Sequence, residues 1–213
     1  MGLVYQTGYY LSRFLAHCCF DFRVVGREKI PGEGPMILAM NHQSFLDPPL
    51  AGIACDREIY YLARKSLLRW PFLGALFPKM NVVPVDEVGT DLSALKTVIR
   101  IVKSGHGTVI FPEGTRSRDG RLQEAQPGLG MVVAKTKAPV VPMRVFGAFE
   151  AFPRNSKRPR FSPITICVGE VLRFSDADFA GEPKVVYRQI SETVMQRIAE
   201  LELPEDRRPD SER

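Results

Sequence analysis

Residues 90–111 read TDLSALKTVIRIVKSGHGTVIF, a helix pattern followed at once by a strand pattern. In the first part, apolar side chains recur at the spacing of one helix face, Thr90 can cap the start and Gly105 ends the helix. The second part, 107–111, is an apolar run of the kind found in strands that are buried on both faces. This succession indicates an α/β domain with a largely parallel sheet.

The same alternation continues on both sides of this stretch. Apolar runs predict strands at 36–40, 58–62, 81–85, 139–145 and within 159–168, and helical spacing predicts helices at 48–55, 129–137 and 183–203, with short helices around a bend at 66–77. We therefore expect one α/β domain, residues 23–203, with a mostly parallel or mixed sheet flanked by helices. A helical segment (1–22) precedes it, and a charged tail (204–213) with the composition of a disordered segment follows it.

The composition limits the partners and cofactors. The net charge of +5 suits an anionic membrane, phosphorylated substrates or nucleic acid, but no nucleic-acid-binding motif is present, so we expect no nucleic-acid partner. The chain has four cysteines without a CxxC pair and three histidines, so we expect no metal and no cofactor. Reduced thiols suit a cytosol-facing protein. Cys18 and Cys19 lie in an apolar segment, where we expect them to be packed.

The N-terminal segment has the pattern of an interfacial helix. Polar residues interrupt it too often for a membrane span. They fall on one narrow stripe and leave the remaining surface aromatic and aliphatic: Gln6, Arg13, His17 and Asp21. Such a helix either lies in the bilayer interface or packs on the body of the protein. We expect peripheral attachment to the cytoplasmic face of a membrane, with core packing as the alternative.

Two further features bear on the membrane. A basic loop lies near Phe152 and Phe161 and is either simply solvated or in contact with anionic headgroups: Arg154, Lys157, Arg158 and Arg160. Trp70, next to Pro71, is a candidate for the interface.

The segment Asn41-His-Gln-Ser-Phe-Leu-Asp47 follows the first expected strand and contains an HxxxxD motif. A neutral imidazole at His42 can take the proton of a hydroxyl that attacks a thioester carbonyl. A carboxylate at Asp47 can fix the tautomer and stabilise the imidazolium. Alternatively, Asp47 before Pro48 is a helix N-cap, and His42 is a structural loop residue. His42 is nevertheless the histidine with an acidic neighbour at a suitable distance along the chain.

The segment Phe111-Pro-Glu-Gly-Thr-Arg-Ser117 ends the apolar strand of the opening stretch. Gly114 permits a close approach of a ligand to the backbone, and Arg116 carries a planar fork that matches phosphate oxygens. Glu113 can orient Arg116 or hold a polar group of the acceptor. The alternative is a surface turn in which Glu113 and Arg116 form a weak local ion pair.

Together, the two segments resemble the glycerolipid acyltransferase family, which includes the 1-acylglycerol-3-phosphate acyltransferases. Residues 65–74 are similar to the family's second block and residues 140–143 to its fourth, so four blocks occur in order over residues 36–146. The resemblance implies an α/β fold, a membrane-associating helix and a hydrophobic tunnel for the acyl chain. It also implies an acyl-CoA or acyl-carrier-protein donor and a lysophospholipid acceptor, foremost 1-acylglycerol-3-phosphate.

The resemblance assigns roles to particular residues. His42 would be the general base and Asp47 its orienting carboxylate. Substrate-binding residues would be Asn41, Lys65, Glu113, Gly114, Thr115 and Arg116. The chain departs from the family at Glu87 and Gln126, where basic residues are common, which leaves Arg116 and Lys65 to bind a phosphate and makes the identity of the acceptor an open question.

Three functions compete at this point. Acyl transfer to a lysophospholipid, or to another hydroxyl or amine acceptor, accounts for all four blocks. A hydrolase acting on thioesters or lipid esters could use the same base, although the chain lacks a GxSxG nucleophile motif. A lipid-binding protein without catalytic activity would not need the polar residues of both motifs.

Overall fold

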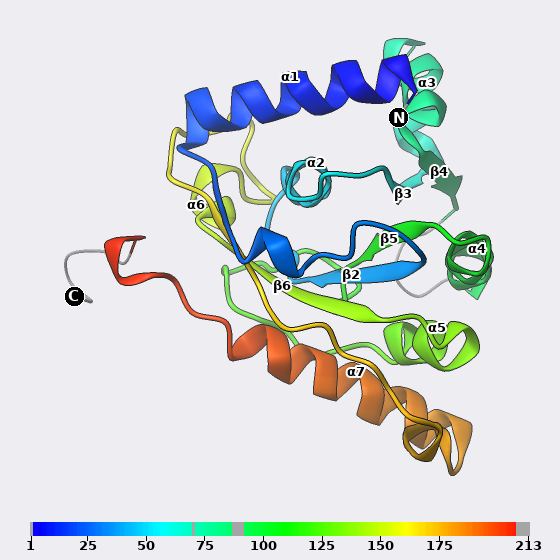
Figure 1. Ribbon diagram of the computed structural model, residues 1–213. Helices are drawn as coiled ribbons and strands as arrows, with labels where there is room; N and C mark the ends of the chain where they lie inside the picture. Colours follow the sequence, from blue (N-terminus) through cyan, green and yellow to red (C-terminus); the bar gives the residue numbers. More distant parts are fainter. Residues whose placement is uncertain (1, 70, 87–91, 208–213) are drawn as a thin grey trace.

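The computed structural model describes residues 2–69, 71–86 and 92–207, and its centre is a seven-stranded sheet (Figure 1). The strands lie in the order β1-β7-β6-β2-β5-β3-β4. Their bounds are β1 Arg23–Val25, β2 Met36–Met40, β3 Ile59–Arg64, β4 Val82–Val85, β5 Gly107–Ile110, β6 Val140–Phe146 and β7 Thr165–Val168. Neighbours pair in parallel except β6 and β7, which are antiparallel. The prediction of an α/β domain with a mixed sheet is confirmed.

Helices cover both faces of this sheet. They are α1 Leu3–Phe20, α2 Asp47–Ile53, α3 Pro71–Leu76, α4 Leu92–Lys103, α5 Gly128–Thr136, α6 Ala148–Ala151 and α7 Pro183–Ala199. Figure 1 shows α2 and α6 on one side of the sheet with α1 lying across them as an outer layer, and α5 and α7 on the other side. Short 3-10 helices connect these elements at Arg27–Lys29, Lys65–Arg69, Phe77–Met80, Asp176–Phe179 and Glu205–Arg207.

The central strand β2 is buried on both faces. Met36, Leu38 and Met40 join the core beneath α1 and α2, whereas Ile37 and Ala39 join the core formed with α4, α5 and α7. All five side chains have no exposed surface. Alternate residues of a strand point to opposite faces, so an unbroken apolar run is what a doubly covered strand requires. The segment that follows β2 therefore starts from a closely packed support.

Helix α1 has one packed face and one exposed face. Tyr5, Tyr9 and Ala16 are buried in the core above the sheet, and the Tyr5 hydroxyl accepts the backbone N–H of Ile59 at 3.1 Å. Large apolar side chains are exposed on the other side: Leu3, Tyr10, Leu11, Phe14 and Leu15. The packing alternative therefore holds for one face of the helix, and contact of the other face with a bilayer stays a prediction. Among the described residues, no helix is long and apolar enough to cross a membrane.

Several elements differ from expectation. The short β1 and α6 were not predicted, because three or four residues carry too little periodicity to be recognised. The late strand begins only at Thr165, after Pro159 and Pro163, which have no N–H to donate to a ladder. Packing of Cys18 is a wrong prediction: the side chain is exposed on α1, while Cys19 is half-buried.

The ends of other expected elements also need comment. The C-terminal helix stops at Ala199 rather than near residue 203. The charged tail begins with a 3-10 helix in which Arg207 contacts the Asp21 carboxylate and Asp206 contacts Arg23. Residues 208–213, Trp70, Glu87 and Thr90 lie outside the described residues.

Candidate active site

The two sequence motifs meet at the carboxyl edge of the sheet. Strands β2 and β5 are parallel neighbours, so the segments that follow them leave the sheet side by side. His42 comes two residues after β2, and Glu113 comes three residues after β5. Two contacts join the segments: the His42 backbone N–H donates to Glu113 Oε1 at 2.9 Å, and the Ser117 N–H donates to the His42 carbonyl at 2.7 Å.

His42 and Asp47 form a hydrogen-bonded pair. The Nδ1 of His42 lies 2.7 Å from Oδ2 of Asp47. The carboxylate has no exposed surface, while 17% of the imidazole side chain is exposed. A buried carboxylate at Nδ1 selects the tautomer that carries the proton there, which leaves Nε2 with a free lone pair. The arrangement can accept a proton at Nε2 and stabilise the resulting imidazolium.

The same carboxylate oxygen shapes the loop. Oδ2 of Asp47 also accepts the backbone N–H groups of Gln43 and Ser44, at 2.6 and 2.7 Å. These donors precede α2, whose N-cap is Leu46 and which has no side-chain cap hydrogen bond. The helix-capping alternative for Asp47 is therefore wrong, because its carboxylate folds the preceding loop back toward His42.

Glu113 supports His42 rather than Arg116. Its second carboxylate oxygen accepts the backbone and side-chain N–H groups of Gln123, at 3.3 and 2.9 Å. Burial raises the pKa of Glu113 above its ordinary value, although the hydrogen bonds from His42 and Gln123 oppose the shift. The alternative of a local ion pair with Arg116 is not what the structure shows, because the carboxylate is used to fix the His42 backbone.

Two aromatic rings pack against site residues, Phe111 on His42 and Phe45 on Arg116. The His42 ring stacks on Phe111, with centroids 3.9 Å apart and planes inclined by 15°. The Arg116 guanidinium lies over the Phe45 ring, 3.5 Å from its centroid, and its buried Nη1 has no hydrogen-bond partner in the described chain. Burial first, and the nearby charge of Arg154 second, lower the pKa of Arg116. Arg116 is thus a desolvated cation with an unused donor, which suits an anionic ligand.

The remaining predicted residues divide into two groups. Gly114 adopts a positive φ of 70°, as a close turn requires, and Thr115 is exposed beside it. Asn41 is fully buried and its amide bonds both backbone groups of Val145, at 2.7 and 3.2 Å, which is a structural use. Lys65 is exposed and forms an ion pair with Asp86 at 2.8 Å. The structure therefore gathers the residues around His42 and Arg116 but gives Asn41 and Lys65 other partners.

Sequence reasoning gave no role to Gln123, Phe45 or Phe111. Both phenylalanines belong to the quoted motifs, so their position next to His42 and Arg116 in the sequence was a usable signal. Gln123 lies ten residues beyond Glu113 in an irregular segment, and nothing in the sequence distinguishes it from other polar loop residues. Its contact depends on how the loop after β5 returns.

An apolar cavity lies behind the stacked Phe111. It has a volume of about 60 Å³ and is lined by side chains of β3, β5 and α4, including Tyr61, Leu62 and Val98. Because a water molecule occupies about 30 Å³ in the liquid, this space is far smaller than an acyl chain. This pocket does not match the tunnel that the resemblance implies, so the tunnel stays a prediction.

A larger hollow lies elsewhere on the molecule. It measures about 750 Å³ and is lined by the end of β6, by α6 and by the C-terminal segment, including Phe146, Glu150 and Arg207. None of the residues proposed from the motifs lines it. Arg144 on its wall already donates to the Ala199 and Leu201 carbonyls. Size alone therefore does not single out a candidate site, and the His42–Asp47 pair remains the candidate.

Comparison with known proteins gives a family match that spans both motifs. The family model described as Acyltransferase matches residues 21–146. A 1-acyl-sn-glycerol-3-phosphate acyltransferase of Bacillus subtilis is 30% identical over 183 residues, which cover 84% of this chain and 87% of that protein. A chloroplastic 1-acyl-sn-glycerol-3-phosphate acyltransferase of Brassica napus is 32% identical over 63% of this chain but only 40% of its own length. The chain spans less than half of such chloroplastic relatives.

A solved structure is similar over nearly the whole chain. The crystal structure of the 1-acyl-sn-glycerophosphate acyltransferase PlsC from Thermotoga maritima covers 94% of this chain with 79% of its own, at 26% sequence identity and a TM-score of 0.71. The family match includes both motifs and 126 of the 213 residues (21–146). The chain therefore belongs to the acyltransferase family.

Proposed function

We propose that this protein transfers an acyl group from a thioester carrier to the free hydroxyl of 1-acylglycerol-3-phosphate and so forms phosphatidic acid. The acceptor oxygen attacks the thioester carbonyl carbon while Nε2 of His42 takes the hydroxyl proton. The carbon–sulfur bond then breaks, and the imidazolium returns its proton to the departing thiolate. Asp47 holds Nδ1 and balances the charge on the ring during the step.

The observation that carries the proposal is the 2.7 Å contact between Nδ1 of His42 and the buried Asp47 carboxylate. Of the three histidines, His17 contacts the Arg13 carbonyl and His106 packs against the Tyr60 ring, so neither has this arrangement. Arg116 beside the pair supplies an unused donor for a phosphate oxygen. The acceptor follows from that cation and from the activity named for the relatives in B. subtilis and T. maritima.

The acyl chain requires an apolar site near the thioester. The pocket behind Phe111 adjoins the ring that stacks on His42 and is lined largely by apolar side chains. We propose that the chain enters here and that the wall formed by α4 moves outward to admit it, since a volume of about 60 Å³ is far smaller than an acyl chain. Acyl-CoA and acyl-carrier protein both present the same thioester, and both are candidate donors.

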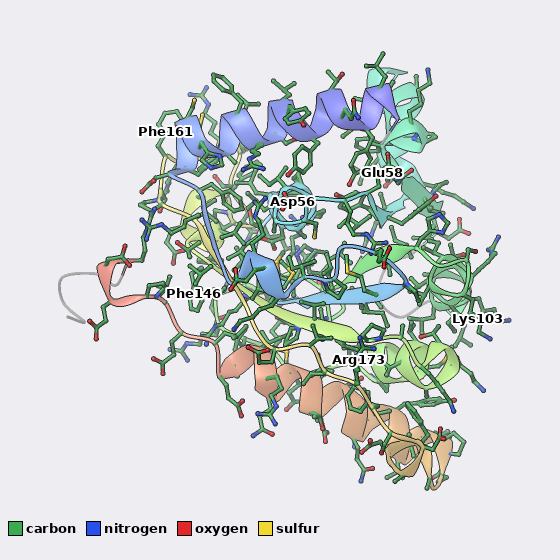
Figure 2. The ribbon with its side chains drawn as sticks, viewed as in Figure 1. Asp56, Glu58, Lys103, Phe146, Phe161 and Arg173 are labelled. Atoms are coloured by element: carbon green, nitrogen blue, oxygen red, sulfur yellow. The ribbon has the colours of Figure 1, made fainter. Side chains whose placement is uncertain are left out.

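We further propose peripheral attachment to the cytoplasmic face of an anionic membrane. The exposed face of α1 carries five large apolar side chains, a pattern typical of interfacial helices. Phe161, which is 82% exposed, lies near the C-terminal end of α1 in Figure 2, next to the basic loop 154–160. A hydrogen bond from the Ile164 N–H to the Phe20 carbonyl connects that segment to the helix. Together they would place aromatic and basic groups at one lipid surface.

The test of the reaction is mass-spectrometric detection of product. Protein, 1-acylglycerol-3-phosphate and either acyl-CoA or acyl-carrier protein are combined, with His42→Ala in parallel and His106→Ala as the matched control. We expect phosphatidic acid from the wild type and from His106→Ala, and a rate lowered by at least about 100-fold in His42→Ala, the usual minimum for a lost general base. A folded His42→Ala protein with a near-normal rate would refute the mechanism. Release of the carrier without consumption of acceptor would indicate a hydrolase instead.

The test of attachment is vesicle flotation. Phe14→Glu places a charge on the exposed face of α1, whereas Val185→Glu makes the same change at an exposed position of α7 across the sheet (Figure 1). We expect Phe14→Glu to release the protein from anionic vesicles and Val185→Glu to leave it bound, with unchanged thermal stability in both. Equal binding of the two variants would contradict docking through α1.

A further inference from the structure

Three arginines stand at the active-site edge without carboxylate partners. Arg64, Arg116 and Arg154 form no ion pair with any described residue. Lys65, the cation that the family resemblance assigns to the acceptor, is instead paired with Asp86 at 2.8 Å. The unpaired positive charge of this edge therefore resides on the arginines.

Arg154 is held next to the His42 loop by its neighbours in the chain. Pro153, the preceding residue, forms an antiparallel bridge with Ser44. The Ser44 hydroxyl donates to the Phe152 carbonyl at 2.8 Å, and the rings of Phe45 and Phe152 lie 5.4 Å apart. The loop that carries Arg154 is thus attached to the segment between the two catalytic candidates.

Arg116 lies against the same aromatic group. Its guanidinium covers the Phe45 ring, which also contacts Phe152. Burial lowers the pKa of Arg116, and the positive charge of Arg154 lowers it further, in keeping with the Phe45–Phe152 contact that joins the two loops. Arg116 also retains a buried Nη1 without a partner. An anion bound between the two guanidiniums would offset their like charges and would accept a hydrogen bond from the unused Nη1.

Arg64 reaches the same edge of the sheet from a different strand. It is the last residue of β3, which runs parallel to β5, so it leaves the sheet at the same edge as the Arg116 segment. After burial and Arg154, its charge is a smaller cause that lowers the pKa of Arg116, while Asp47 opposes the shift. The three side chains come from three separate segments: the end of β3, the loop after β5 and the loop after α6. Convergence of unpaired cations from separate segments favours a polyvalent anion over a single carboxylate.

We propose that Arg154, together with Arg116 and Arg64, binds the phosphate monoester of the acceptor, and that Arg154 determines the preference for phosphorylated acceptors. The assignment rests on the proposed function and makes the substrate class specific: a glycerolipid with a terminal phosphate, recognised by guanidiniums and not by Lys65. It also explains how the chain can bind such an acceptor although Gln126 replaces a common basic residue. Arg154 acts on binding and not on proton transfer.

The experiment compares Arg154→Ala with Arg158→Ala, an exposed arginine in the same loop, and with Lys65→Ala. Initial rates are measured in uncharged detergent micelles with 1-acylglycerol-3-phosphate and, separately, with 1-acylglycerol, which has no phosphate. For Arg154→Ala we expect the KM of the phosphorylated acceptor to rise by about 10-fold or more, as for the loss of a charge-assisted hydrogen bond. We expect its kcat, its KM for the thioester and its activity on 1-acylglycerol to stay unchanged. Arg158→Ala should resemble the wild type, and Lys65→Ala should raise the KM of the phosphorylated acceptor less than Arg154→Ala does.

Several outcomes would overturn the assignment. One is a KM in Arg154→Ala equal to that in Arg158→Ala; another is an equal loss with both acceptors, which would indicate a structural role. A larger rise in KM in Lys65→Ala than in Arg154→Ala would mean that Lys65 binds the phosphate, as the family resemblance implies. An effect seen only with anionic vesicles and not in uncharged micelles would mean that Arg154 binds membrane lipids.

A binding measurement separates this inference from the proposed reaction. Inorganic phosphate and glycerol 3-phosphate should raise the melting temperature of the wild type and of Arg158→Ala but not of Arg154→Ala. If the wild type forms no acylated product yet shows this difference, the proposed function fails and the anion site stands. If product forms but the ligands stabilise all variants equally, the reaction stands and the assignment of Arg154 fails.

Discussion

Replacing Asp47 by asparagine would separate the charge of the carboxylate from its role in orienting His42. Three donors converge on Oδ2: Nδ1 of His42 and the backbone N–H groups of Gln43 and Ser44. An amide oxygen can occupy the same position and accept all three, and the two backbone donors prevent the amide from turning its own NH₂ toward them. The imidazole therefore keeps its tautomer, and only the negative charge is lost.

The size of the effect follows from the geometry. A carboxylate and an imidazolium whose contacting atoms are 2.7 Å apart have charge centres about 4 Å apart, which corresponds to about 4 kcal/mol at an effective dielectric of 20. At 1.4 kcal/mol per factor of ten, we expect kcat to fall about 1,000-fold. The new NH₂ group takes the place of Oδ1, which is buried without a partner, and should lower the free energy of unfolding by about 1–3 kcal/mol.

Two measurements check this prediction. Acyl transfer at saturating substrate gives kcat, and urea denaturation gives the free energy of unfolding. Asp176→Asn is the matched control, because Asp176 is exposed, lies after β7 and forms an exposed ion pair with Lys137. A folded Asp47→Asn protein within about threefold of wild-type kcat would show that the Asp47 charge does not assist the reaction. A loss of kcat explained wholly by unfolding would show that the carboxylate serves the fold alone.

Three further changes have defined outcomes. Glu113→Gln should remove one source of pH dependence from the stability of the fold. The folded-state pKa of Glu113 lies above the ordinary 4.5, so just above that pH the folded protein binds more protons than the unfolded chain, and wild-type stability falls as pH rises. In a series of thermal melts at different pH values, the variant should lack this fall. Asn41→Ala leaves two buried backbone groups of β6 unpaired and should lower the urea-derived free energy of unfolding by about 2–5 kcal/mol, with an unchanged KM for the acceptor if its role is structural. Gly130→Ala places a methyl group 1.9 Å from the Tyr187 carbonyl oxygen and should lower the melting temperature through about 1–3 kcal/mol of overpacking, while Gly32→Ala, which meets no atom within 4 Å, should not.

Each of these can fail in an informative way. An unaltered slope of stability against pH in Glu113→Gln would mean that another carboxylate titrates in that window. A raised KM in a stable Asn41→Ala protein would restore its predicted role in substrate binding. Equal melting temperatures for the two glycine variants would mean that α5 and α7 can separate without loss.

The parts of the fold that could be predicted are those with long, regular patterns. The apolar run 36–40 and the helix–strand stretch 92–110 carry full periodicity, and the structure has them almost at the predicted ends. Short elements such as α6 could not be predicted, because four residues complete only about one helical turn. The antiparallel direction of β7 depends on how the chain returns after α6, and no residue pattern encodes that path.

The candidate site divides in the same way. His42 and Asp47 are close in sequence, so a turn that brings them together could be foreseen from their spacing and chemistry. The contacts of Glu113 with Gln123, and of Asn41 with Val145, join residues through the packed sheet, and their partners could be identified only once the strands were placed. The Arg154 loop lies more than a hundred residues from His42 in the sequence, and its position became known only from the Pro153–Ser44 bridge.

We expect the two faces of helix α1 to be under different selection, because one closes the core and the other is the face proposed to contact lipid. Tyr5, Tyr9 and Ala16 close the core, so a library of single substitutions should tolerate few side chains there under any growth condition. Leu11 and Phe14 face outward and bury little, so polar side chains at these positions should leave the amount of folded protein unchanged and reduce only lipid-dependent activity. Along the helix, positions where substitution lowers the amount of folded protein should recur about every 3.6 residues. Positions where it lowers only lipid-dependent activity should recur with the same period on the opposite face. A shortened chain lacking α1 would lose part of its core together with the exposed apolar face, so the helix cannot serve as a removable anchor.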